Sequence, residues 1–177
     1  MENKLTLIKQ CNKKMKRQGV IVRKVTVLII ASVFISFALI TAVKYFNRLL
    51  WSDVSTEMLS WEEAVDYCEY LNEGGSDNWR LPDISELRTL IRNCSYTEPE
   101  GSCNVTIDCD DDSCWGDECI RCPLAIDGRY SMFKDKGEFW SSTSSSNNDK
   151  FAWYVGFFDG LVLDGNKENQ IFVRCVR

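Results

Sequence analysis

The chain has 177 residues, a formal net charge of −5, nine cysteines and no histidine. Without histidine, these residues cannot form Ser-His-Asp or Cys-His nucleophile pairs or any zinc site that uses an imidazole ligand. The sequence also contains no glycine-rich phosphate loop and no dinucleotide-binding motif. Together these features argue against an enzyme and against a resident cofactor.

The N-terminal part is organised around one uncharged stretch. Residues 1–24 are basic, whereas residues 25–43, VTVLIIASVFISFALITAV, contain no charged side chain. As a helix this stretch would span roughly 28 Å, close to the ~30 Å hydrocarbon core of a bilayer. A cleaved signal peptide is the alternative, but its apolar region is usually only about 7–15 residues long. The best cleavage site here, after Ala42, also has Ile40 where a small residue should lie. We therefore expect a retained transmembrane signal anchor.

Charge predicts the orientation of this anchor. Residues 1–44 hold nine basic side chains and one acidic side chain, a net charge of +8. The residues after 44 hold twelve basic and 25 acidic side chains, a net charge of −13. Because basic flanks stay on the cytoplasmic side, we expect a cytoplasmic N-terminus and a periplasmic or extracellular C-terminal part. The basic flank will also bind anionic lipid headgroups, so no nucleic-acid partner is needed to explain it.

Cysteine parity agrees with this topology. Cys11 lies in the predicted cytoplasmic segment, where thiols stay reduced. The other eight are an even set in an exported domain, which predicts four disulfides. They are Cys68, Cys94, Cys103, Cys109, Cys114, Cys119, Cys122 and Cys175. Six of the eight fall within residues 94–122, and their spacing leaves all fifteen pairings open.

The exported part begins with a connector at residues 44–50 and a short strand expected at residues 49–52. Ser60 and Glu63 then form a capping-box pattern, which predicts a helix that begins at Ser60. Gly74 and Gly75 are expected to end it. Its apolar residues recur at three- and four-residue steps. They are Trp61, Ala64, Val65, Cys68 and Leu71.

A second helix is predicted directly after Pro82, which holds Leu81 in an extended conformation. Asp83 and Glu86 repeat the capping pattern. The apolar stripe of this helix consists of Ile84, Leu87, Leu90 and Ile91. We interpret both helices as core elements rather than as places of chemistry.

Residues 94–122 have no apolar periodicity, so covalent bridges must hold them as a stapled loop. The loop carries an acidic run, Asp108, Asp110, Asp111 and Asp112, with the oxygen ligands that calcium prefers. The spacing matches no EF-hand loop, and the single CxxC at residues 119–122 has no second pair to complete a zinc site. Calcium is therefore a candidate ligand of the acidic run, and a solvated acidic loop is the alternative.

After Gly128 the pattern changes to period two, which is typical of strands. The apolar runs are GEFWSST, FAWYVGFF, LVLDG and QIFVRCVR. Residues 159–160, Asp-Gly, predict a hairpin, and residues 164–166 predict a further turn. Residues 141–150, SSTSSSNNDK, predict a polar loop at a sheet edge or a binding face. Two helices followed by an antiparallel sheet define an α+β fold with the helices against one side.

Most tryptophans occupy patterned positions and are expected to be buried. These core aromatic residues are Trp61, Trp79, Trp140, Trp153 and Phe157. Trp115 in the stapled loop has no periodic partner. Because sugars often bind an exposed aromatic face beside carboxylates, Trp115 with Asp117 and Glu118 forms a candidate ligand site. The alternative is that Trp115 packs under its own loop.

Four motifs follow one another in the exported part: WRLP at residues 79–82, FWSST at 139–143, AWYVGFFDG at 152–160 and VRCVR at 173–177. In this combination, residues 51–177 resemble the Lcl C-terminal domain family, which is named for the C-terminal domain of the Legionella collagen-like adhesin. The resemblance implies a C-type-lectin-like fold, distantly similar to that of formylglycine-generating enzymes. It also implies a disulfide between Cys68 in the first helix and Cys175 in the last strand.

Together, the sequence and the resemblance predict a membrane-anchored, exported, lectin-like module that recognises a glycan or another extracellular polymer, with a role in adhesion at a bacterial cell envelope. The net charge of −13 after residue 44 would repel sulfated polyanions, so glycosaminoglycans are not the expected ligands. The alternative is a structural domain whose stapled loop docks an envelope protein and binds no sugar. A divergent enzyme of the formylglycine-generating type is a third interpretation.

Overall fold

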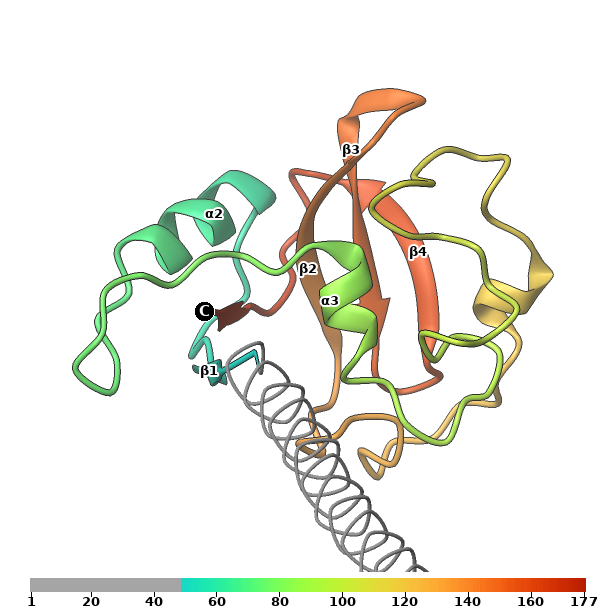
Figure 1. Cartoon of the computed structure of the whole chain (residues 1–177), viewed down its shortest axis with the longest axis horizontal. Coiled ribbons are helices and arrows are strands. Elements are labelled where there is room, and N and C mark those ends of the chain that lie inside the picture. Colours follow the sequence, from blue (N-terminus) through green and yellow to red (C-terminus); the bar gives the residue numbers. More distant parts are fainter. Residues whose placement is uncertain (1–48) are drawn as a thin grey trace, which may run out of the picture. The chain divides into compact units, whose positions relative to one another are not determined.

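The structure, a computed structural model, describes residues 49–177. The predicted basic segment, the signal anchor and residues 44–48 of the connector lie outside these residues. In the described part, no helix is both long and apolar enough to cross a membrane. In chain order the elements are β1 (Trp51–Val54), α2 (Trp61–Glu69), α3 (Ile84–Arg88), the 3-10 helix η1 (Asp117–Ile120), β2 (Glu138–Ser145), β3 (Asn148–Gly156), β4 (Leu161–Asn166) and β5 (Arg174–Val176) (Figure 1).

Both helices begin where their capping residues predict. The Glu63 carboxylate accepts the Ser60 backbone N–H at 2.9 Å and the Ser60 hydroxyl at 2.7 Å. At α3 the exchange is reciprocal, because Asp83 accepts the Glu86 N–H at 2.8 Å and Glu86 accepts the Asp83 N–H at 3.0 Å. These bonds satisfy backbone donors that have no partner within the helix.

Both helices end earlier than predicted. Helix α2 stops at Glu69, and Gly74 and Gly75 lie in a separate turn with φ of +63° and +75°. Residues 73 and 76 close that turn by exchanging two backbone hydrogen bonds. Helix α3 stops at Arg88 because the next three N–H groups bond carbonyls three residues back, which tightens the last turn.

The main sheet has three antiparallel strands in the order β2-β3-β4. Strand β2 runs through residues 141–145, so the predicted polar loop at 141–150 is wrong for most of its length; only residues 146–147 separate β2 from β3. The serine and threonine hydroxyl groups of β2 make this strand possible, because inside the domain they form hydrogen bonds with the backbone instead of with water. Ser141 Oγ donates to the Trp153 carbonyl at 2.7 Å, and Thr143 Oγ accepts the Ile84 N–H at 3.0 Å.

The predicted hairpin at residues 159–160 is present between β3 and β4. Of the two residues only Gly160 has positive φ, at +64°, because the connection is a four-residue loop rather than a two-residue turn. The turn predicted at residues 164–166 is wrong, since these residues pair with β3. A Cβ at Gly165 would lie 3.1 Å from the Tyr154 ring. This glycine therefore makes room for a cross-strand aromatic ring rather than for a turn.

The last strand does not join the main sheet. Strand β5 pairs antiparallel with β1 in a separate two-stranded sheet, and β1 begins two residues later than predicted. Backbone bonds of Arg80 to Val176 flank β5 on its other side. A disulfide between Cys68 and Cys175, with Cα atoms 5.5 Å apart, fastens α2 to β5. This is the pairing that the family resemblance implies.

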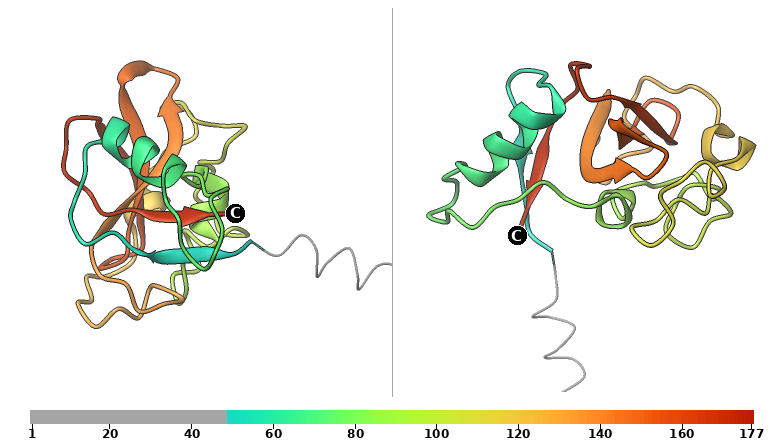
Figure 2. Two further views of the ribbon diagram at one scale, coloured as in Figure 1. Left: turned by 90° about the vertical axis from the view of Figure 1, so that its left-hand side faces the viewer. Right: turned by 90° about the horizontal axis from the view of Figure 1, so that it is seen from above.

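Alternate residues of β3 belong to two different cores. Trp153 and Val155 pack into the cluster that contains α3 and the stapled loop. Ala152 and Tyr154 pack into the cluster that contains α2 and the Cys68–Cys175 disulfide. The two helices therefore cover opposite faces of the sheet (Figure 2). The expectation that both lie on one side is wrong, because β3 is apolar on both faces and each face needs a cover.

Candidate ligand-binding site

The stapled loop is closed by three nested disulfides. The outermost joins Cys94 to Cys122, the next joins Cys103 to Cys119, and the innermost joins Cys109 to Cys114. Because the bridges are nested, each one closes a shorter loop that lies within the loop closed by the previous bridge. With Cys68–Cys175, all eight cysteines of residues 49–177 are in disulfides, and the predicted number of four is confirmed.

A buried arginine holds the first half of this loop. The Arg88 side chain is 1% exposed, and it donates to the carbonyls of Thr97 at 3.0 Å, Glu98 at 2.9 Å and Cys103 at 3.0 Å and also to that of Val105. Burial lowers the pKa of this guanidinium below its ordinary value. Sequence reasoning missed this residue, because nothing in the spacing of a helical arginine distinguishes a buried one from a solvated one.

The acidic run does not converge on one point. Among residues 49–177, no group of three or more acidic, cysteine or histidine side chains is placed to hold a metal ion. Asp111 instead accepts the Ser113 N–H at 2.7 Å, and the Ser113 hydrogen bonds hold the pKa of Asp111 below its ordinary value. The Asp110 carbonyl accepts the Trp153 indole N–H at 3.0 Å and the Ser146 N–H at 3.1 Å. Asp108 and Asp112 are exposed.

Trp115 is a packing residue of the stapled loop. Its indole N–H donates to the Val162 carbonyl of β4 at 3.1 Å, and its ring is partly buried against the α3 cluster. Asp117 lies exposed at the start of η1, and Glu118 forms an ion pair with Arg121 at 3.5 Å. The indole N–H is therefore engaged, and only the exposed part of the ring is left for a ligand.

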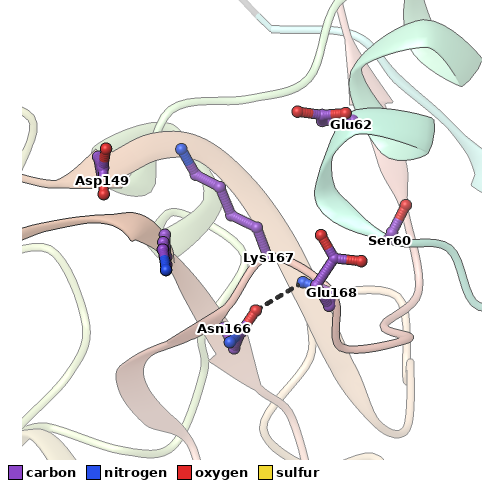
Figure 3. Close-up of a pocket in the computed structure, with 7 residues that line it drawn as sticks. Ser60, Glu62, Asp149, Asn166, Lys167 and Glu168 are labelled. Atoms are coloured by element: carbon purple, nitrogen blue, oxygen red, sulfur yellow. Dashed lines mark hydrogen bonds between the residues drawn. The ribbon is translucent and has the colours of Figure 1, made fainter.

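A polar pocket of about 490 Å³ lies elsewhere, where three segments meet. These segments are the start of α2, the first part of β3, and the end of β4 with the turn after it. The lining residues are Ser60, Glu62, Asp149, Lys150, Asn166, Lys167 and Glu168 (Figure 3). The lining contains no large apolar side chain, so the pocket suits a polar ligand.

Backbone hydrogen bonds fix the three segments relative to one another. The Trp61 N–H donates to the Lys167 carbonyl at 2.8 Å, and the Lys167 N–H donates to the Lys150 carbonyl at 2.9 Å. The Trp61 indole N–H also donates to the Ser141 carbonyl at 2.8 Å. The rim of the pocket is therefore held by main-chain contacts, while its side chains remain available.

Lys167 lies at the centre of the pocket. Its ammonium nitrogen is 4.2 Å from the centroid of the Trp61 ring, a cation–π contact. In Figure 3 the same ammonium group points into the space between Asp149 and Glu62. The pocket thus combines three carboxylates with two ammonium groups and one amide.

Most of these polar groups have no partner inside the domain. Within residues 49–177, the carboxylates of Glu62, Asp149 and Glu168 form no ion pair. The Asn166 side-chain oxygen accepts the Glu168 N–H at 2.9 Å, which leaves the Asn166 amino group free to donate. The pocket therefore offers both donors and acceptors at one place.

Sequence reasoning found only part of this pocket. The polar stretch at residues 141–150, predicted as a candidate binding face, supplies Asp149 and Lys150. Sequence reasoning missed the contributions of Glu62 and of residues 166–168, because polar residues are common at the start of a helix and in turns and so do not indicate a site. Trp115 is not part of the pocket, since it packs on the α3 side of the sheet whereas Trp61 packs on the α2 side.

The fold and its four bridges define a small, disulfide-stapled α+β domain with a polar pocket. The family model of the Lcl C-terminal domain matches residues 45–177, and the chain belongs to this adhesin-related family. The match covers the entire part of the chain that the structure describes. A comparison with curated proteins finds no match.

Proposed function

We propose that this protein is a membrane-anchored, exported binding module that recognises a glycan or another polyhydroxylated extracellular polymer. The membership in an adhesin-related family supports an extracellular binding role. The pocket carries the proposal further, because it displays unpaired carboxylate acceptors beside ammonium and amide donors. A sugar hydroxyl needs such a mixed set, since it donates one hydrogen bond and accepts two.

The fold that we propose for this module is a C-type-lectin-like domain. The Cys68–Cys175 disulfide, which joins the first helix to the last strand, supports this assignment. We propose a retained signal anchor at residues 25–43, with the N-terminus cytoplasmic and the domain outside. The eight disulfide-bonded cysteines support an oxidising compartment for residues 49–177.

We propose binding rather than catalysis. The chain contains no histidine, and every cysteine of residues 49–177 is in a disulfide, so this part offers no thiol for chemistry of the formylglycine-generating type. We also propose that binding needs no calcium. The carboxylates of Asp110 and Asp111 accept hydrogen bonds from Ser146 and Ser113, which supports this, because those groups hold the loop itself.

A glycan array with residues 49–177, oxidised and probed in calcium and in chelator, tests the proposal. The double variant Asp149→Ala/Asn166→Ala removes an acceptor and a donor from the pocket. The matched control is Asp77→Ala/Asn72→Ala, which changes two exposed residues outside the pocket lining. We expect the pocket variant to lose binding and the control variant to keep it, with and without calcium.

Three other results would assign the function differently. Loss of binding in Trp115→Phe, with the pocket variant unaffected, would move the site to Trp115, Asp117 and Glu118. Binding only in calcium would make the acidic run a metal site. If the folded, fully oxidised protein binds no glycan on the array, an envelope protein would be favoured as the partner. The stapled loop exposes 47% of Ile107 and 46% of Ile120, which is the surface such a partner would cover.

A further inference from the structure

Residues 121–136, called here the apolar–basic loop, differ in charge from the rest of the domain. Residues 49–177 hold eleven basic and 25 acidic side chains, a net charge of −14. The apolar–basic loop alone holds four basic and two acidic side chains, a net charge of +2. Its basic residues are Arg121, Arg129, Lys134 and Lys136. Arg121 and Arg129 are paired with carboxylates, whereas Lys134 and Lys136 form no ion pair within residues 49–177. An anionic surface would therefore attract the end of the loop that carries the two lysines and repel the remainder of the domain.

The same loop exposes large apolar side chains. Leu124 is 72% exposed and Ile126 is 75% exposed, while Ala125 between them packs against the core. Met132 and Phe133 are 46% and 45% exposed. Apolar side chains next to basic ones, on the outside of a domain, are the combination that binds the headgroup region of an anionic bilayer.

The loop is held in shape by contacts within itself and by backbone hydrogen bonds to the segment after α3. The Tyr130 hydroxyl donates to the Pro123 carbonyl at 2.8 Å, and Tyr130 itself is 3% exposed. Gly128 has φ of +75°, and a Cβ at this position would lie 2.5 Å from the Lys134 carbonyl oxygen. The Met132 N–H donates to the Leu90 carbonyl at 2.8 Å. The exposed side chains thus project from an ordered base.

Arg174 places this loop beside β1. Its guanidinium lies 4.6 Å from the centroid of the Phe133 ring, pairs with Asp135 at 2.6 Å and donates to the Ser52 carbonyl. Ser52 belongs to β1, which is the first strand of the described residues. The loop and β1 both occupy the lower part of Figure 1 and of the left view in Figure 2.

The polar pocket lies at the other end of β2. The apolar–basic loop ends at residue 136, just before β2 begins at Glu138. The pocket residues Asp149 and Lys150 follow the turn at the far end of that strand. Eight residues of strand separate the two ends, a distance of about 26 Å at 3.3 Å per residue.

We propose that the apolar–basic loop docks this domain on the surface of an anionic phospholipid bilayer, with Leu124 and Ile126 entering the headgroup region. The proposal rests on the anchored topology given under Proposed function. In that topology only residues 44–48 connect the apolar stretch to the described domain, a reach of at most about 18 Å. A domain tethered so closely would meet the bilayer with the loop and present the pocket away from it.

The test compares the full chain in a bilayer with residues 49–177 in solution. We expect the shorter protein to fold on its own, because its core, its four disulfides and its sheets are all formed within that range. The full chain is reconstituted into phosphatidylcholine vesicles with and without phosphatidylglycerol. Hydrogen exchange at residues 123–133 is then measured by mass spectrometry. We expect exchange slowed by about tenfold or more with phosphatidylglycerol, relative to the free domain.

Variants distinguish docking from other causes of protection. Leu124→Ser/Ile126→Ser should restore the exchange of the free domain, and it should leave folding intact because both side chains are mostly exposed. Tyr70→Ser is the matched control, since Tyr70 is 79% exposed on the α2 side, and it should keep the protection. Insertion of the anchor is measured separately, by whether the chain stays with the vesicles through an alkaline carbonate wash. Unchanged exchange in an inserted chain, or protection that persists in the double variant, would overturn the docking proposal without touching the anchor or the glycan site.

Discussion

Arg174 and Asp135 form an ion pair that is almost completely withdrawn from water. The Arg174 Nη2 atom lies 2.6 Å from Asp135 Oδ1, and the side chains are 8% and 6% exposed. Arg174 Nε also donates to Asp135 Oδ2 at 3.2 Å, and the Ser131 hydroxyl donates to the same oxygen at 3.0 Å. This pair joins β5 to the apolar–basic loop, so the C-terminal strand and a loop about forty residues earlier in the chain are held as one piece.

Removal of one partner of this pair should destabilise the domain strongly. Asp135→Ala leaves the Arg174 charge buried without a counter-ion, which typically costs about 3–5 kcal/mol. The measurement is the free energy of unfolding of residues 49–177 in urea. Asp127→Ala is the control, because Asp127 pairs with Arg129 at 2.8 Å in an exposed position, and its removal should not shift the urea midpoint. Equal midpoints for the two variants would show that the buried pair contributes no more than the exposed one.

Arg88 should be as important for the stapled loop as a disulfide. Arg88→Lys keeps the charge, but an ammonium group cannot reach the four carbonyls that the guanidinium serves. We expect a loss of about 3 kcal/mol or more in the free energy of unfolding, because buried carbonyls lose their donors. Cleavage by a protease within residues 97–105 should become faster.

The control for this prediction is Arg92→Lys. The Arg92 side chain donates only to the carbonyls of Thr89 at 2.7 Å and Ile91 at 2.6 Å, both in its own turn. Its replacement should cost less than about 1 kcal/mol. A larger loss for Arg92→Lys than for Arg88→Lys would contradict the role that we assign to Arg88.

The outer and inner bridges should differ in their effect on stability. Cys68 and Cys175 are 107 residues apart, whereas Cys109 and Cys114 are five apart. By chain entropy, loss of the first pair should cost about 4–5 kcal/mol and loss of the second about 2 kcal/mol. Paired Cys→Ala variants, unfolded in urea, measure both values. The entropic account would be wrong for this domain if the short bridge proved the costlier one to remove.

Two glutamates should give opposite pH dependences. Burial, followed by the charge of Asp159, raises the pKa of Glu138 above its ordinary value of 4.5. The folded state therefore holds this proton more tightly than the unfolded state does. Glu138 consequently makes the protein less stable as pH rises from below 4.5 through the raised pKa. Glu138→Gln should be more stable than the wild type at pH 7, and the difference should vanish below the unfolded pKa.

Glu63 should behave in the reverse way. Its hydrogen bonds to the Ser60 hydroxyl and backbone N–H lower its pKa below 4.5, so its stabilising effect is present above that pH and is lost as pH falls through the lowered value. Glu63→Gln should therefore be less stable than the wild type at pH 7 and equal to it in acid. Urea midpoints of both variants across pH 3–7 measure these effects. A parallel response of the two variants would contradict the assignment.

Local features of this fold could be predicted from the sequence. The starts of both helices follow from Ser60 and Asp83, because a capping residue and its glutamate partner lie only three residues apart. The hairpin at Gly160 is local in the same way. The number of disulfides could be counted, since four bridges follow from eight cysteines in one exported domain.

The candidate site could be predicted only in part. The composition of residues 141–150 is polar, but whether a serine lies in a loop or in a buried strand depends on the acceptor opposite it. For Ser141 that acceptor is the Trp153 carbonyl, on the neighbouring strand. The sequence indicates no partner for Trp115 within its own segment, because its partner, the Val162 carbonyl, is 47 residues away. The pocket could not be predicted for the same reason, because Ser60 and Glu168 come together only in the folded domain.

The sequence by itself determined the helix starts, the α+β class, the number of bridges and the family, because each of these depends on spacing within a short stretch or on an ordered set of motifs. Only the tertiary structure decided that β5 pairs with β1, that the two helices cover opposite faces of the sheet, and that the six loop cysteines pair in nested order. The physical reason is the separation along the chain between the residues that interact. Backbone pairing, burial and disulfide partners are chosen among residues far apart in the chain, and that choice follows from how both apolar faces of β3 are covered.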